Sequence, residues 1–96
     1  MKQNLKKIKR EITWFRVYYN YKRENDKAVK FDFYTINTNN ANINKLMCEF
    51  KKWCKNWSGK GYIEILTITA GAYEEAEKWA KKHNAKFAGK KIKFNN

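Results

Sequence analysis

The sequence predicts an α+β domain in which two helices cover one face of a mixed four-stranded sheet. Four stretches are rich in β-branched and aromatic residues, and two longer stretches repeat apolar residues at the three-then-four spacing of a helix. Polar or glycine-containing segments separate them. A length of 96 residues is enough for one hydrophobic core and too short for two. The expected order along the chain is β-β-α-β-α-β.

Residues 1–10 are expected to form a basic N-terminal arm, and residues 11–96 a single α+β domain. The arm carries several cations but only Leu5 and Ile8 as sizeable apolar side chains, so it lacks the apolar segment of a signal peptide. No later stretch is long and apolar enough to span a bilayer. The expected localisation is therefore cytoplasmic, without a transmembrane segment.

The first two strands are expected to form a hairpin. Residues 11–21 are dense in aromatic and β-branched side chains, and the polar segment 22–27 is expected to turn the chain into a second strand at residues 28–36. Alternate positions in a strand point to opposite faces. One set of alternating residues is Val29, Phe31 and Phe33, and the other is Lys30, Asp32 and Tyr34. The first set is expected to face the core.

A helix is expected from about residue 41 to Ser58-Gly59. The polar run at residues 37–40 can accept hydrogen bonds from the first free amides of the helix, and glycine tolerates the conformation that ends one. Cys48 and Cys54 are six positions apart on this helix and point away from each other, which excludes a disulfide between them. The expected buried stripe contains Ile43, Leu46, Met47, Phe50, Trp53, Cys54 and Trp57.

The second half of the chain is expected to form a strand, a helix and a strand. Residues 62–69 are predicted to lie in the middle of the sheet. A helix follows at residues 71–84, with acidic side chains early and basic side chains late, as the helix dipole favours. Asn84 is expected to cap its C-terminus. The last strand is expected at residues 87–94, after a turn near Gly89.

Strand alternation predicts what each face of the sheet carries. The face toward the helices is expected to contain Phe15, Val17, Phe31, Phe33, Ile63, Ile65, Ile92 and Phe94. The other face would then combine flat rings with cations, a combination that stacks unpaired bases and holds phosphates. The expected stacking residues are Trp14, Tyr18, Tyr34 and Tyr62, and the expected phosphate contacts are Arg16, Lys30, Lys60, Lys91 and Lys93. Single-stranded RNA or DNA is the expected ligand.

The charge balance also predicts a polyanionic partner. Lys and Arg number 22 against 9 for Asp and Glu, which gives a formal net charge of +13. Nucleic acid is the first expectation, followed by an anionic membrane surface or an acidic protein. The exposed rings could instead pack in a homodimer interface or beneath the N-terminal segment. The basic side chains Lys45, Lys51, Lys52 and Lys55 of the first helix could follow the phosphates of a duplex.

Residues 60–94 carry a family resemblance. The segment contains Lys60-Gly61-Tyr62 at the start of a strand, and its residues 74–80 and 84–94 supply a helix and a closing basic strand. In these stretches it resembles the second half of an RNA-recognition motif, over about a third of the chain. The resemblance implies that Tyr62 stacks on a base and that Lys60 contacts a phosphate. The second aromatic position of the motif falls on Glu64.

Three functions are compatible with these features. The first is non-enzymatic nucleic-acid binding, with no cofactor or metal. The second is an interaction protein, such as a small phage or mobile-element protein that inhibits a host nucleic-acid enzyme or ribonucleoprotein. The third is a metal-dependent nuclease in which Asp32 and Glu64 share one sheet face.

Other residues give little support for catalysis. His83 is the single histidine and lies beside lysines at a helix end, where capping or solvation is expected rather than base catalysis. Cys48 and Cys54 have no histidine pair or second cysteine pair to complete a zinc site. No catalytic residue and no metal site is therefore expected.

Overall fold

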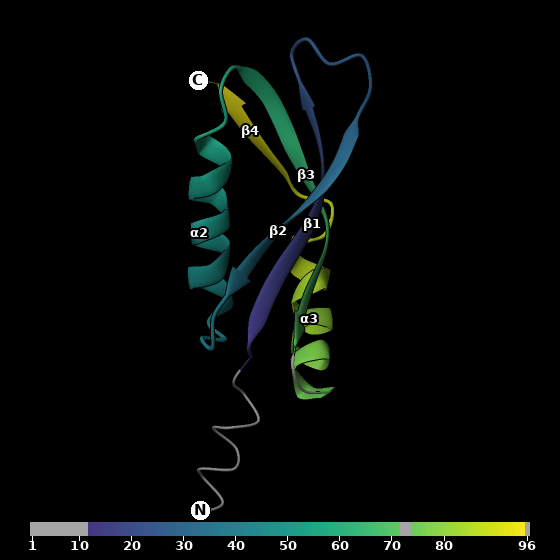
Figure 1. The fold of residues 1–96 in the computed structure, drawn as a ribbon. Coiled ribbons are helices and arrows are strands. Elements are labelled where there is room, and N and C mark those ends of the chain that lie inside the picture. Colours follow the sequence, from purple (N-terminus) through teal and green to yellow (C-terminus); the bar gives the residue numbers. More distant parts are fainter. Residues whose placement is uncertain (1–11, 72–73, 96) are drawn as a thin grey trace, which may run out of the picture.

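The computed structural model describes residues 12–71 and 74–95, and this part of the chain contains four strands and two helices (Figure 1). They follow the expected order β-β-α-β-α-β. The predicted basic arm, residues 1–10, lies outside the described residues. The elements are β1 (Trp14–Arg23), β2 (Lys30–Asn37), α2 (Ile43–Lys55), β3 (Lys60–Gly71), α3 (Glu74–Phe87) and β4 (Lys91–Asn95).

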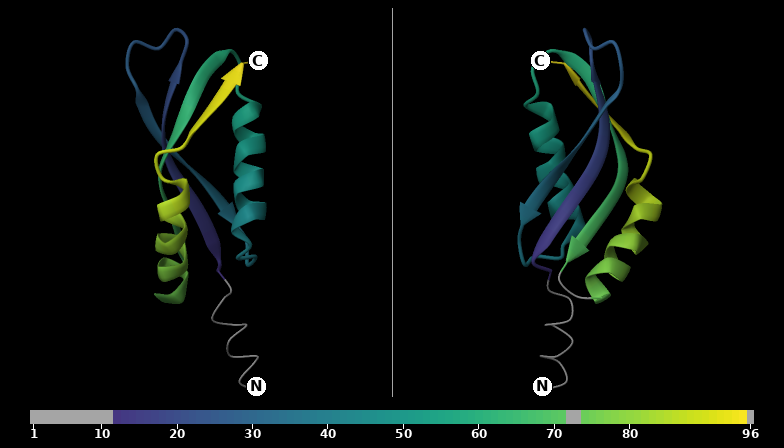
Figure 2. Two further views of the ribbon diagram at one scale, coloured as in Figure 1. Left: turned by 180° about the vertical axis from the view of Figure 1, so that it is seen from behind. Right: turned by 45° about the vertical axis from the view of Figure 1, so that its right-hand side comes forward.

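The four strands form one sheet in the order β2-β1-β3-β4, and each neighbouring pair is antiparallel. The α+β class and the interior position of β3 are confirmed, but the expectation of a mixed sheet is wrong. The connection between β3 and β4 explains the difference. α3 runs back alongside β3 and β4 continues in the same direction, so β4 meets β3 as an antiparallel neighbour (Figure 2). A parallel pair would need a crossover that returns the chain to the starting end of the strand.

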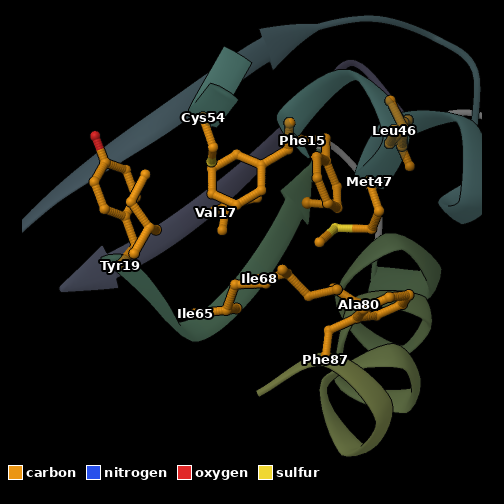
Figure 3. Close-up of a cluster of buried hydrophobic side chains, with 14 of the residues drawn as sticks. Phe15, Val17, Tyr19, Leu46, Met47, Cys54, Ile65, Ile68, Ala80 and Phe87 are labelled. Carbon is orange, nitrogen blue, oxygen red and sulfur yellow. The ribbon is translucent and has the colours of Figure 1, made fainter. Parts of the chain in front are cut away.

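The described part of the chain has one hydrophobic core, between the sheet and the two helices (Figure 3). α2 lies over one side of the sheet, here called the inner face. The ring of Tyr19, in the middle of β1, has its centroid 5.7 Å from that of Trp53 and 6.0 Å from that of Phe50. The helices bury Leu46, Met47, Phe50 and Cys54 from α2 and Ala76, Ala80 and Phe87 from α3.

The ends of α2 follow from its flanking residues. The helix begins after Asn42, whose side-chain oxygen accepts a hydrogen bond from the Lys45 amide at 3.2 Å. Asn40, in the run expected to cap the helix, instead accepts from the Asn42 amide at 3.0 Å. Past the helix, Gly59 has a φ of 85°, a conformation that glycine adopts without strain.

The two cysteines of α2 have different environments. Cys48 is exposed, Cys54 is buried, and both are free thiols. Burial raises the pKa of the Cys54 thiol to about 12, because desolvation disfavours the thiolate. Cys54 therefore acts as a small apolar core residue.

α3 lies along the part of β3 that β4 leaves unpaired. The ladder between the two strands covers only residues 60–64 of β3. Further along, the Asn84 side chain donates to the Ile68 carbonyl at 2.9 Å and accepts from the Ile68 amide at 2.6 Å. Asn84 thus takes the place of a neighbouring strand. It is not the expected C-cap, because α3 continues to Phe87.

A β-bulge in β3 changes which positions face the core. Leu66 is the extra residue, unpaired where the register with β1 shifts. Ile63 and Ile65 are buried before the bulge, and Ile68 and Ala70 are buried after it. The buried positions therefore change from odd to even numbers at Leu66.

The predicted orientation of β2 is wrong. Tyr34 lies opposite Val17 and shares the inner face, where its ring stacks on that of Trp53 with centroids 4.5 Å apart. Ile36 also packs against the core. Partial burial of these two side chains decides the orientation of β2, because earlier positions of the strand are exposed on both sides and gain nothing from either orientation. The residues expected in the core are exposed instead, by 50% for Val29, 61% for Phe31 and 48% for Phe33.

Candidate nucleic-acid interface

The side of the sheet opposite α2 is here called the outer face. Residues that lie opposite each other in a ladder point to the same side, so the strand register assigns the members of this face. Its aromatic residues are Trp14, Tyr18, Phe31, Phe33 and Tyr62, and its cationic residues are Arg16, Lys22, Lys60, Lys91 and Lys93.

Arg16 lies among the rings of the outer face. Its Nε donates to Thr35 Oγ1 at 2.8 Å, and its Nη1 donates to the Tyr18 hydroxyl at 3.3 Å. The guanidinium carbon is 4.6 Å from the centroid of the Phe33 ring and 5.3 Å from that of the Trp14 ring, which are cation–π distances. These contacts hold a planar cation in place, and its other N–H groups can still bind an anion.

Two rings of β2 extend this cluster to the edge of the sheet. Tyr18 is nearly parallel to Phe31, with centroids 6.1 Å apart and 5° between the ring planes. Its centroid is 5.9 Å from that of Phe33. Exposed rings gathered in this way mark a surface for a partner.

Lysines surround Tyr62 at the end of the outer face nearest the β1–β2 turn. Lys22 lies opposite Tyr62 on β1, and Lys93 lies opposite it on β4. The Lys91 ammonium is 4.9 Å from the centroid of the Tyr62 ring. Among the described residues, neither these lysines nor Lys60 has a carboxylate oxygen within 4.0 Å. Their charge is available to neutralise phosphates.

A groove of about 700 Å³ lies between the outer face and α3. Trp14 lines it from the sheet, and Glu74 and Glu77 line it from the helix. The Trp14 indole rests on Gly71, where an added methyl group would overlap the ring. Thr69 also lines the groove, and its buried hydroxyl oxygen has no hydrogen-bond partner in the described part of the chain. The groove thus has an aromatic ring on one side and carboxylate and hydroxyl acceptors nearby. This combination suits a base with exocyclic amino groups.

Most predicted site residues lie on the outer face. These are Trp14, Arg16, Tyr18, Lys60, Tyr62, Lys91 and Lys93. The predicted placement of Tyr34 and Lys30 on this face is wrong, because both lie on the inner side of β2. Tyr34 stacks beneath α2, and Lys30 forms an ion pair with Asp26 at 3.4 Å.

Sequence reasoning missed three members of the outer face. It assigned Phe31 and Phe33 to the core and placed Lys22 in a turn. The signal that could have found the two rings is Ile36, an apolar residue two positions beyond Tyr34. A strand that buries both Tyr34 and Ile36 has to expose Phe33.

The two proposed nuclease carboxylates do not share a face. Asp32 lies opposite the buried Tyr19 on the inner side, whereas Glu64 lies opposite Asn20 on the outer face. Burial, and secondly the Asp32 carboxylate, raise the pKa of the Tyr19 phenol, which agrees with this placement. Within residues 12–71 and 74–95, no three potential metal-binding side chains of the His, Cys, Asp or Glu type cluster together. The pairing of Asp32 with Glu64 at one site is therefore wrong.

No family model, curated protein or solved structure matches this chain. No helix in the described ranges combines the length and the apolar composition needed to cross a bilayer. The function therefore has to be inferred from the chemistry of the outer face.

Proposed function

We propose that the protein binds single-stranded nucleic acid across the outer face of its sheet. The observation that carries this proposal is that rings and cations share the one face that α2 leaves open. Stacking of a base on an aromatic side chain contributes about 1–3 kcal/mol, while lysine and arginine neutralise the backbone. The formal net charge of +13 adds long-range attraction for a polyanion.

The two ends of the outer face suit different parts of a single-stranded nucleic acid. Lys22, Lys60 and Lys93 lie around Tyr62 and suit the phosphates, because none of the three forms an ion pair with a carboxylate in the described part of the chain. The rings around Arg16 suit the bases. At the far end, the groove beside Trp14 could take one base edge-on, with acceptors from α3 facing its amino group.

Flat rings favour a single strand over a duplex. Bases in a duplex stack on each other and offer only their edges in the grooves, so Tyr18 and Tyr62 could not reach their faces. The lysines of α2 could follow duplex phosphates, but they lie on the other side of the sheet. The flat rings of the outer face therefore favour unpaired RNA or DNA.

Replacing the ring of Tyr62 tests stacking directly. Binding of labelled oligo(dT) and oligo(U), followed by fluorescence anisotropy, should weaken about 5- to 150-fold in Tyr62→Leu, which corresponds to about 1–3 kcal/mol. Tyr62→Phe is the matched control and should bind like the wild type, because it keeps the ring. Equal affinity of the Leu variant and the wild type would remove Tyr62 from the interface.

A pair of matched triple variants locates the phosphate contacts. Replacing Lys22, Lys60 and Lys93 with Gln should reduce the slope of log Kd against log salt concentration by about 2, because each phosphate contact contributes about 0.7 for a single strand. Replacing Lys45, Lys51 and Lys52 of α2 with Gln removes the same charge and should leave the slope unchanged. The opposite result would place the polyanion on α2.

An interaction protein that inhibits a host nucleic-acid enzyme or ribonucleoprotein is the second candidate. Phe31 and Phe33 favour it, because exposed rings at the edge of a sheet suit a protein partner as well as a base. Stoichiometric copurification of one host protein, with no affinity for free oligonucleotide, would support this candidate against the first.

A further inference from the structure

β2 is an open edge of the sheet. Within residues 12–71 and 74–95, it is the outermost strand and pairs only with β1. The Thr38 amide donates to the Thr13 carbonyl at 3.2 Å just beyond this ladder, and hydrogen-bonded pairs recur at every second residue of an antiparallel pair. The backbone groups of Phe31, Phe33 and Thr35 therefore point away from β1 toward the free edge. In agreement, the Phe33 amide donates to the side chain of Asp32 at 2.8 Å.

A second copy of β2 can add antiparallel to this edge in only a few registers. Only residues whose backbone N–H and C=O groups point to the free edge can hydrogen-bond across it. In both copies these are the odd-numbered residues, so odd-numbered residues pair with odd-numbered ones. Centring the pair on Asp32 places two aspartates opposite each other, and centring it on Lys30 places two lysines opposite each other. Both are unfavourable. Centring it on Phe33 leaves both charged residues opposite uncharged ones.

The register centred on Phe31 is self-complementary in charge. It places Lys30 opposite Asp32 of the second copy, and the two-fold axis repeats this pair on the other side. Lys30 and Asp32 are exposed on the inner side of β2, where the helices do not cover the strand. Both side chains are therefore accessible to a second copy.

The same register matches apolar residues on the outer side. Phe31 lies opposite Phe31 of the second copy, and Val29 lies opposite Phe33 of the second copy on either side of the axis. These three are large apolar side chains that are exposed on, or just before, an edge strand, where such side chains favour pairing with another chain. One register thus pairs the charges on one side of the strand and covers the apolar residues on the other.

We infer that the protein forms a two-fold symmetric dimer through β2, in the register centred on Phe31. On dimerisation, the Asp32 carboxylate leaves the Phe33 amide and pairs with Lys30 of the second copy. The Phe33 amide then donates to the Val29 carbonyl of the second copy, and Lys30 gives up its contact with Asp26. The two sheets become continuous, and their outer faces join into one surface.

Charge reversal at the two inner-side residues tests the register. Sedimentation velocity of the wild type without nucleic acid, at about 0.15 M salt, should show a concentration-dependent dimer. Lys30→Asp and Asp32→Lys should each weaken the dimer about tenfold or more, because each places like charges opposite each other at two sites. An equimolar mixture of the two variants should form a heterodimer as tightly as the wild type. Every Asp of one then meets a Lys of the other.

Lys86→Asp is the control, because it reverses an exposed charge on α3 away from β2 and should dimerise like the wild type. Circular dichroism and thermal unfolding should show that each variant folds. A monomeric wild type across the concentration range, single variants that dimerise like the wild type, or a mixture that stays monomeric would each overturn the inference. Monomeric variants that still bind oligo(dT) would leave the proposed function intact, since neither residue lies on the outer face.

Discussion

The two faces of the sheet contain the same kinds of ring but use them differently. On the inner face, the centroids of Tyr19 and Tyr34 lie 4.5–6.0 Å from those of Phe50 and Trp53 on α2. On the outer face, Phe31 is 61% and Phe33 48% exposed, and the other rings are partly exposed. Coverage by a helix, rather than residue type, separates a ring that stabilises the fold from one that is available to a ligand.

β2 shows this difference within a single strand. Tyr34 points inward and stacks on Trp53, while its neighbour Phe33 points outward and contacts Arg16. Rotating β2 about its own axis, so that its two sides exchange places, would bury Phe33 but would expose Tyr34 and Ile36. The position of α2 decides which set is buried.

The largest expected difference between the faces is in stability. Phe50→Ala should lower the free energy of unfolding by about 3–5 kcal/mol, because Phe50 is fully buried and its removal leaves a cavity. Phe33→Ala, the matched outer-face variant, should lower it by about 1 kcal/mol or less. Urea denaturation at low protein concentration measures both. Equal losses would show that the outer-face rings also belong to the folding core.

A smaller loss is expected where α3 joins β3. Asn84→Ala removes both hydrogen bonds to Ile68 and should lower the free energy of unfolding by about 1–3 kcal/mol, because the strand amide and carbonyl lose their partner. The Ile68 amide should also exchange its hydrogen faster. Asn44→Ala, an exposed helical asparagine, is the control and should change stability little. Unchanged protection of Ile68 would contradict the role assigned to Asn84.

The smallest effect concerns pH. Partial burial, and then the charges of Lys82 and Lys86, lower the pKa of His83 below its ordinary value of 6.5. As the pH falls below 6.5, the unfolded chain takes up the proton before the folded protein does, so the folded state loses stability. NMR titration of the single imidazole should give a midpoint below 6.5, and His83→Gln should remove this part of the pH dependence. A midpoint at or above 6.5 would contradict the prediction.

The element order and most of the outer face could be predicted from local sequence. Trp14, Arg16 and Tyr18 alternate with Phe15 and Val17 in β1, where the apolar and polar sides are distinct. This strand pairs with a neighbour on both sides, which fixes the set of alternate residues that faces the core. A short stretch of sequence was enough to place its side chains.

The orientation of β2 could not be read from a short window. In its first half, Phe31 and Phe33 favour a strand whose odd-numbered residues face the core. In its second half, Tyr34 and Ile36 favour one whose even-numbered residues do. The conflict is decided by a helix that follows later in the chain. The bulge at Leu66 is a similar case, because it is defined by the pairing of β3 with β1, a strand more than 40 residues earlier in the chain.

The amino-acid sequence by itself determined the α+β class, the order of the elements, the charge of the surface and the central position of β3. These follow from propensity, spacing and composition, which act over a few residues. Only the tertiary structure decided that the sheet is wholly antiparallel, that Tyr34 is half-buried against α2 while Phe31 and Phe33 face solvent, and that Asn84 binds a strand edge. These features depend on contacts between segments that are distant in the sequence. The burial and hydrogen bonding of a side chain are determined by the residues close to it in space rather than by those next to it in the sequence.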